Sequence, residues 1–136
     1  MDVRFQERTD GQVDVDLGLN WPLLTEALND SVSSLPPRGA KGNGPSTYWV
    51  DVALRGLDRA IASQSHRPFT WGNNTFLRVA GDRVEARYDY DDEDVEGEFI
   101  EAQALRGILH AWRQRIVESA ARSTAPLPRS GRRNRM

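Results

Sequence analysis

The clearest pattern in this chain covers residues 75–119, which read TFLRVAGDRVEARYDYDDEDVEGEFIEAQALRGILHAWRQRIVES. Two runs of alternating apolar and polar residues flank a Gly-Asp pair, which is typical of a β-hairpin with a two-residue loop. An acidic stretch follows this hairpin. From Leu105 to Ile116 the apolar residues then recur at the spacing of one helix face, so the sequence predicts a long amphipathic helix that begins near Glu101.

The residues before this stretch add a pair of strands at the N-terminus. Val13, Val15 and Leu17 alternate with acidic residues, which is typical of a strand that has one solvent-exposed face. A Thr-Asp-Gly turn precedes them, and turns of this composition join antiparallel strands. Residues 2–19 are therefore expected to form a hairpin.

Two shorter helices are predicted between these strands and the hairpin that follows residue 75. Asn20 is the expected cap of the first, which ends near Val32, and the second covers residues 48–63. The Pro- and Gly-rich residues 33–46 between them are expected to form a mobile surface loop. The PFTW sequence at 68–71 is expected to be a short strand.

The order of these elements predicts an α+β fold. Strands joined by tight turns favour an antiparallel sheet, so we expect a small antiparallel sheet packed against about three helices. Residues 1–121 form this single domain. Residues 122–136 carry five arginines and lack an apolar face, and they are expected to be a disordered, Arg-rich tail.

Composition narrows the class of protein. The chain has no cysteine, its N-terminus is too polar for a signal peptide, and no apolar run is long enough to cross a membrane. We therefore expect a soluble, cytoplasmic protein without a membrane partner. The net charge of −2 becomes −7 for residues 1–121 when the five tail arginines are removed. A body this acidic repels nucleic acid and favours a basic partner.

The functional prediction rests on the acidic stretch. Residues 89–101 contain eight acids and no lysine or arginine, which is more charge than a plain connection needs. Clustered carboxylates beside tyrosines can pair with the basic residues of a protein partner. The predicted partner-binding residues are Tyr88, Asp89, Tyr90, Asp91, Asp92, Glu93, Asp94, Glu96 and Glu98. A solvated acidic loop without a partner remains the alternative.

Calcium binding and catalysis are weaker hypotheses for the same stretch. Residues 92–103 partly resemble a calcium-binding EF-hand loop, but Gln103 stands where a bidentate glutamate is needed and a strand precedes the loop. Catalysis would need a desolvated carboxylate or a nucleophile with its base. The stretch is expected to be exposed, and His66 and His110 have no partner at a suggestive spacing. No cofactor, metal or enzymatic activity is predicted.

Two other classes of function stay open. A small enzyme or ligand-binding domain would have a pocket lined by Trp49, Trp71 or Trp112, although these side chains are expected to lie in the core. A structural subunit would use the long helix to form oligomers. The sequence does not indicate an oligomeric state.

In size, acidity and α+β composition, the chain is similar to the cytoplasmic immunity proteins of bacterial toxin systems. The resemblance includes no specific motif. It implies a binding protein that covers the basic surface of a partner, such as a nuclease toxin, with its own acidic residues.

Overall fold

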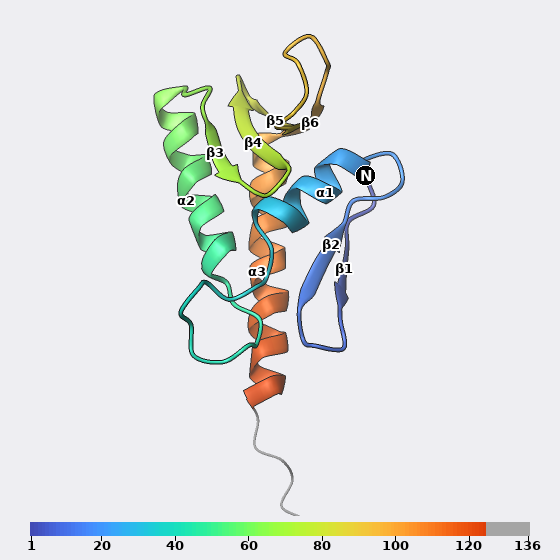
Figure 1. The fold of residues 1–136 in the computed structure, drawn as a ribbon, viewed down its shortest axis with the longest axis vertical. Helices are drawn as coiled ribbons and strands as arrows, with labels where there is room; N and C mark the ends of the chain where they lie inside the picture. The colour runs from blue at the N-terminus through green and yellow to red at the C-terminus, as the bar shows by residue number, and fades with distance from the viewer. Residues whose placement is uncertain (125–136) are drawn as a thin grey trace, which may run out of the picture.

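The computed structural model describes residues 1–124, which form two antiparallel sheets and three helices (Figure 1). This arrangement confirms the predicted α+β class, although the strands are divided between two sheets. The elements, in chain order, are β1 (Arg4–Glu7), β2 (Val13–Asp16), α1 (Pro22–Ser31), α2 (Tyr48–Ser63), β3 (Pro68–Trp71), β4 (Thr75–Ala80), β5 (Arg83–Tyr88), β6 (Glu98–Glu101) and α3 (Ala102–Thr124).

The larger sheet is a meander in which β3, β4, β5 and β6 pair in chain order. The predicted Gly-Asp loop joins β4 to β5, and Gly81 has a φ of +67°, which glycine adopts without steric cost. The register places Arg78 of β4 directly opposite Glu85 of β5. Because side chains alternate between the faces of a sheet, this pair lies on the face opposite to Leu77 and Val84.

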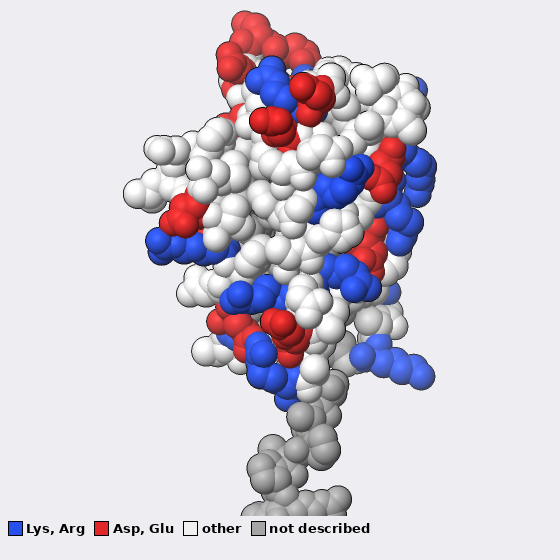
Figure 2. Space-filling view, turned by 180° about the vertical axis from the view of Figure 1, so that it is seen from behind, with Lys and Arg blue, Asp and Glu red and all other residues white. Residues whose placement is uncertain are grey.

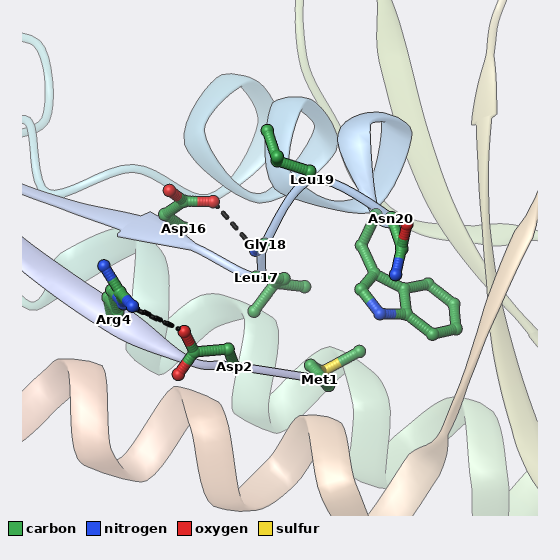
Figure 3. A pocket seen from close by; sticks show the side chains of 9 residues that line it. Met1, Asp2, Arg4, Asp16, Leu17, Gly18, Leu19 and Asn20 are labelled. Atoms are coloured by element: carbon green, nitrogen blue, oxygen red, sulfur yellow. Dashed lines mark hydrogen bonds and ion pairs between the residues drawn. The ribbon is translucent and has the colours of Figure 1, made fainter.

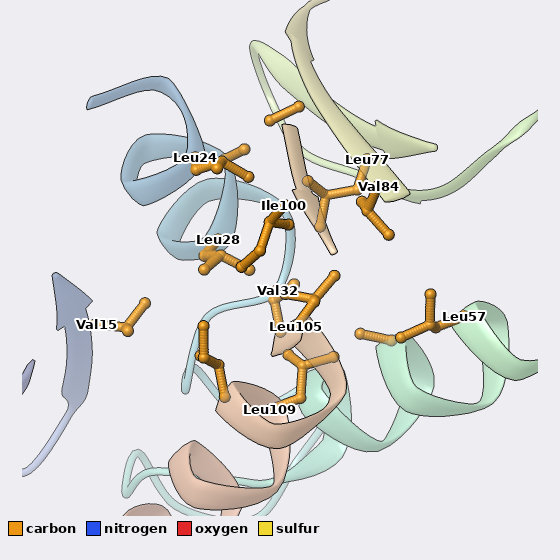
Figure 4. Close-up of a cluster of buried hydrophobic side chains, with 14 of the residues drawn as sticks. Val15, Leu24, Leu28, Val32, Leu57, Leu77, Val84, Ile100, Leu105 and Leu109 are labelled. Atoms are coloured by element: carbon orange, nitrogen blue, oxygen red, sulfur yellow. The ribbon is translucent and has the colours of Figure 1, made fainter. Parts of the chain in front are cut away.

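The inner face of this sheet packs against the helices. Leu77 and Val84 meet Leu24 of α1, Leu57 of α2 and Leu105 of α3 in one buried cluster (Figure 4). Full burial of one such leucine stabilises the fold by roughly 1.5–3 kcal/mol relative to an exposed side chain. The apolar face of α3, which the sequence identified, is therefore part of the core of this chain.

The smaller sheet, β1–β2, packs on α3 rather than extending the larger sheet. Trp112 is fully buried, and its indole N–H donates a hydrogen bond to the carbonyl of Val13 at 2.8 Å. About two turns further on, Ser119 donates to the carbonyl of Gly11 at 2.7 Å. The C-terminal helix is thus joined to the N-terminal hairpin at the first residue of β2 and at the turn that precedes it.

Several local predictions were wrong because tertiary contacts replace local ones. Asn20 does not cap α1, whose N-cap residue is Trp21 and makes no side-chain capping bond. The amide of Leu24 instead donates to the carboxylate of Glu98, at 2.8 Å.

The helix α3 continues to Thr124, past the predicted domain boundary, and residues 125–136 of the predicted tail lie outside the described residues.

Hydrogen bonds attach the loop of residues 33–46 to the rest of the protein near both of its ends. The amide of Ser46 donates to the carbonyl of Ser34 at 2.8 Å, and the buried Ser34 hydroxyl accepts from the amide of Val13 at 2.9 Å. The buried side chain of Gln12 donates to the carbonyl of Asn43 at 3.3 Å. These contacts fix where α2 begins relative to β2.

Candidate protein-binding surface

The acidic segment, residues 88–98, connects β5 to β6 and folds over the outer face of the larger sheet. Two buried arginines on that face hold it. Arg87 donates to the backbone carbonyls of Asp92 and Val95, and Arg78 donates twice to the carboxylate of Glu93, at 3.1 and 3.0 Å. Internal turns add hydrogen bonds from Asp91 to Tyr88 and from Val95 to Asp92. These contacts attach the segment to the outer face of the sheet.

The two arginines are themselves joined through Glu85. Its carboxylate accepts from Arg78 at 2.9 Å and from Arg87 at 3.1 Å, and all three side chains are at most 10% exposed. The hydrogen bond to Glu93, followed by those to Glu85, raises the pKa of Arg78 despite its partial burial. The same bond lowers the pKa of Glu93. The positive charges of two guanidinium groups thus offset the negative charges of two carboxylates. This pairing lowers the free-energy cost of burying the network.

The acids of the segment that remain are not neutralised by this network. The carboxylates of five of them make no hydrogen bond or ion pair within residues 1–124: Asp89, Asp91, Asp92, Asp94 and Glu96. Figure 2 shows acids gathered at the end of the molecule that carries the β5–β6 connection, whereas most Lys and Arg on that face lie further down. The segment is therefore a fixed, strongly negative surface.

Tyr88 and Tyr90 form the aromatic part of this surface. Their rings stack with centroids 5.1 Å apart, and Tyr90 is 69% exposed. Tyr88 donates a hydrogen bond to Glu26 of α1 at 2.8 Å, which is the main reason that its pKa is raised to about 12. With the bond from Leu24 to Glu98, this contact places both ends of the acidic segment against α1.

The structure therefore brings all nine predicted residues to one connection but gives them different surroundings. Glu93 and Glu98 have partners inside the molecule, whereas the five unpaired acids and Tyr90 are available to another molecule. Sequence reasoning did not identify Arg78 and Arg87 as the residues that hold the segment. The sequence does carry a signal for this role. Arginines and a glutamate alternate with apolar residues on β4 and β5, which places these charged side chains on one face of the sheet.

A pocket of about 520 Å³ lies between the start of the chain and the turn that leads from β2 into α1 (Figure 3). Asp2 pairs with Arg4 at 2.8 Å, and Asp16 accepts from the amide of Gly18 at 2.9 Å. Leu19, at the edge of the pocket, is 100% exposed. The full lining is Met1, Asp2, Arg4, Asp16, Leu17, Gly18, Leu19, Asn20 and Trp21.

The tryptophans expected in the core divide into two groups. Trp112 is buried, as predicted, whereas the expectation was wrong for Trp49 and Trp71, which are 37% and 62% exposed. Both line a groove of about 320 Å³ together with Leu35 and Pro36. This groove opens beside the N-terminus of α2 and one end of β3.

Within the described part of the chain, no group of three or more His, Asp or Glu side chains could hold a metal ion. Gly97, which matches the glycine of a calcium loop, has a structural role instead. A Cβ atom there would lie 2.3 Å from the carbonyl oxygen of Ala86, so only glycine lets the segment approach β5 this closely.

None of the helices within residues 1–124 has the length and apolar character that crossing a membrane requires. No family model, curated protein or solved structure matches this chain.

Proposed function

We propose that this protein binds a basic protein partner through the acidic segment and acts as an inhibitor of the immunity-protein type. The observation that carries the proposal is the way in which the segment is held. Arg87 holds its backbone and Arg78 holds the Glu93 side chain, whereas five carboxylates of the segment have no partner within residues 1–124. A connection whose only task was to join two strands would gain nothing from this concentration of like charge.

The arrangement fits recognition of a cationic surface. Carboxylates in fixed positions attract a basic partner over a Debye length and speed its association. The stacked pair of Tyr88 and Tyr90 adds a residue type that commonly anchors protein interfaces. A partner whose basic residues bind a nucleic acid, such as a nuclease toxin, would lose access to its substrate when these acids cover it.

Charge reversal tests this proposal directly. The variant carrying Asp92→Lys and Asp94→Lys changes the net charge by +4 without touching a hydrogen-bonded side chain of residues 1–124. The matched control carries Asp82→Lys and Glu118→Lys, which change the charge equally away from the segment. Partners are isolated from the native host with the wild-type protein, and their affinities are measured at low and high NaCl concentrations.

We expect the acidic-segment variant to lose a basic partner and the control to retain it. The affinity of the wild-type protein should also fall as salt rises, because screening weakens attraction between exposed charges. Equal affinity of both variants for the partner, or affinity that does not change with salt, would contradict the proposal.

A second candidate is binding of a small apolar ligand in the groove lined by Trp49 and Trp71, since both side chains are exposed there. Titration with indole, followed by amide shifts around Asn73, tests this role. Absence of saturable shifts at millimolar indole would remove this candidate.

A further inference from the structure

The loop of residues 33–46 contains the only asparagine of the chain that is followed by glycine, in the pair Asn43-Gly44. Both residues are exposed. Within residues 1–124, the Asn43 side chain makes no hydrogen bond, and the amide of Gly44 donates none. A side-chain carboxamide and the backbone nitrogen that can attack it are therefore both unengaged at this position.

The other asparagines of residues 1–124 lack this combination. The amide that follows Asn20 donates to a backbone carbonyl of its own turn. The amides that follow Asn73 and Asn74 both donate to the carboxylate of Asp30, at 3.0 and 3.1 Å. Asn29 lies within α1, and its side chain bonds to the backbone of β2. Each of them also precedes a residue with a side chain, which crowds the backbone nitrogen.

We propose that Asn43 is a site of spontaneous deamidation. The backbone nitrogen of Gly44 attacks the side-chain Cγ of Asn43, and its proton leaves with the carboxamide nitrogen as ammonia, which closes a succinimide ring. Water then opens this ring. Opening at Cγ gives aspartate, whereas opening at the main-chain carbonyl gives isoaspartate, in which the chain continues through the former side chain. No group is oxidised or reduced, and water is the only co-reactant.

Gln12 restrains this reaction in the folded protein. Its buried side chain donates to the carbonyl of Asn43 at 3.3 Å and accepts from the Ser34 hydroxyl at 2.8 Å. The Asn43 carbonyl belongs to the same planar peptide group as the attacking nitrogen of Gly44. Ring closure turns that nitrogen towards Cγ, an orientation outside the usual backbone regions. The bond from Gln12 therefore opposes the rotation that the attack requires.

The products alter the attachment of the loop to β2. Both products add a negative charge at residue 43. In the isoaspartate, the carbonyl that accepts from Gln12 becomes part of a free carboxylate, and the main chain gains a carbon atom before Gly44. The amide of Ser46 holds the same loop to the carbonyl of Ser34 at 2.8 Å, so the longer chain strains the contacts that position the start of α2.

Peptide mapping by mass spectrometry tests the site. The full chain is incubated at mildly alkaline pH, below its unfolding temperature, and digested with trypsin; a sample digested without incubation is the blank. The peptide of residues 42–55 contains no other asparagine or glutamine, so conversion of an amide to an acid within it belongs to Asn43. We expect this peptide to convert before the peptides that contain the other asparagines, with isoaspartate and aspartate resolved by fragmentation.

Variants test the roles of the two neighbours. In Gly44→Ala no atom lies within 4 Å of the new Cβ, so the fold persists. Its methyl group should slow the conversion of Asn43 about tenfold, equivalent to a barrier higher by about 1.4 kcal/mol. Gly107→Ala, a glycine substitution in α3, should leave the rate unchanged. Gln12→Met removes the donor at similar length and should accelerate conversion about threefold, since one hydrogen bond is lost.

Several results would overturn the proposal. The site is wrong if the peptide of residues 42–55 converts no faster than the others, or if Gly44→Ala converts at the wild-type rate. The restraint is wrong if Gln12→Met leaves the rate unchanged. Should that variant fail to fold, wild-type protein unfolded in urea replaces it, and equal rates in the folded and unfolded chains would then remove the restraint. No partner takes part in these measurements, so their outcome is independent of the proposed function.

Discussion

Arg78 holds the carboxylate of Glu93 through two hydrogen bonds, at 3.1 and 3.0 Å, across the outer face of the sheet. The two residues are unequally buried, since the side chain of Arg78 is 10% exposed and that of Glu93 is 77% exposed. The pair thus joins a buried cation to the tip of the acidic segment.

We expect Glu93→Gln to loosen the acidic segment without unfolding the protein. The substitution removes one charge partner of Arg78 but leaves its bond to Glu85. Hydrogen exchange should become faster at the amides of residues 91–96 and remain unchanged in α3. Glu96→Gln is the control, because Glu96 has no side-chain partner among the described residues. Unchanged exchange in the Glu93 variant would show that the pair does not restrain the segment.

Arg78→Ala should be far more disruptive. Removing this arginine leaves the carboxylate of Glu85, which is 7% exposed, with only Arg87 as its partner. Breaking a buried ion pair in this way typically costs about 3–5 kcal/mol. Urea denaturation should show a loss of that order, whereas Arg55→Ala, at an exposed arginine of α2, should have little effect. A loss below about 1 kcal/mol, the value of an exposed ion pair, would contradict the buried network.

Tyr88 should titrate at a higher pH than an ordinary tyrosine. Its hydrogen bond to Glu26, followed by burial and the nearby negative charges, raises its pKa from 10.0 to about 12. The folded state therefore retains this proton more strongly than the unfolded state. Its contribution to stability is complete below pH 10.0 and is lost as the pH rises through about 12. In a titration of phenolate absorbance, Tyr88→Phe should remove the late component and Glu26→Gln should shift it towards 10.0.

Asp30 should stabilise the turn between β3 and β4. Its carboxylate accepts from the amides of Asn73, Asn74 and Thr75 and from the Thr75 hydroxyl. Burial alone would raise the pKa of Asp30, but these bonds lower it below the usual 3.8. We expect Asp30→Asn to cost about 2 kcal/mol at neutral pH, since charged acceptors strengthen such bonds.

The pH dependence of Asp30 gives a second measurement. Because its folded pKa is lowered, its contribution is present above pH 3.8 and is lost as the pH falls through the lower folded value. The difference in unfolding free energy between wild type and Asp30→Asn should therefore shrink in acid. Asp82→Asn, at an exposed aspartate, is the control variant.

Two glycine substitutions should have opposite effects. In Gly97→Ala the new Cβ would lie 2.3 Å from the carbonyl of Ala86 and 2.9 Å from the side chain of Glu85. Overpacking against backbone costs roughly 1–3 kcal/mol and should displace the acidic segment. Gly107→Ala in α3 meets no atom within 4 Å, so it should stabilise the helix by about 1 kcal/mol. Thermal denaturation of both variants measures the contrast.

The parts of the fold that could be predicted are those in which the spacing of apolar residues marks a buried face. The β4–β5 hairpin and the apolar face from Leu105 to Ile116 follow from residue spacing alone, and both are observed. Contacts between distant residues were not predictable in this way. Glu98 takes over the capping role expected of Asn20, although it lies 74 residues after the amide of Leu24 that it binds.

The candidate site was only partly visible in the sequence. The charge density of the acidic segment is a local property and could be read directly. Its attachment to Arg78 and Arg87 depends on which face of the sheet these side chains occupy and on how the connection folds back. The exposure of Trp49 and Trp71 likewise depends on packing, because an aromatic residue type alone does not distinguish core from surface.

The hydrogen bond from Trp112 to Val13 spans 99 residues, and that from Ser119 to Gly11 spans 108. During synthesis, the N-terminal hairpin leaves the ribosome long before the helix that completes its packing. The side of β2 that packs on α3 must therefore remain uncovered until almost the whole described chain has been made. Pairings this distant slow folding and prolong the exposure of apolar strands, so the newly made chain is most vulnerable to aggregation at its first hairpin.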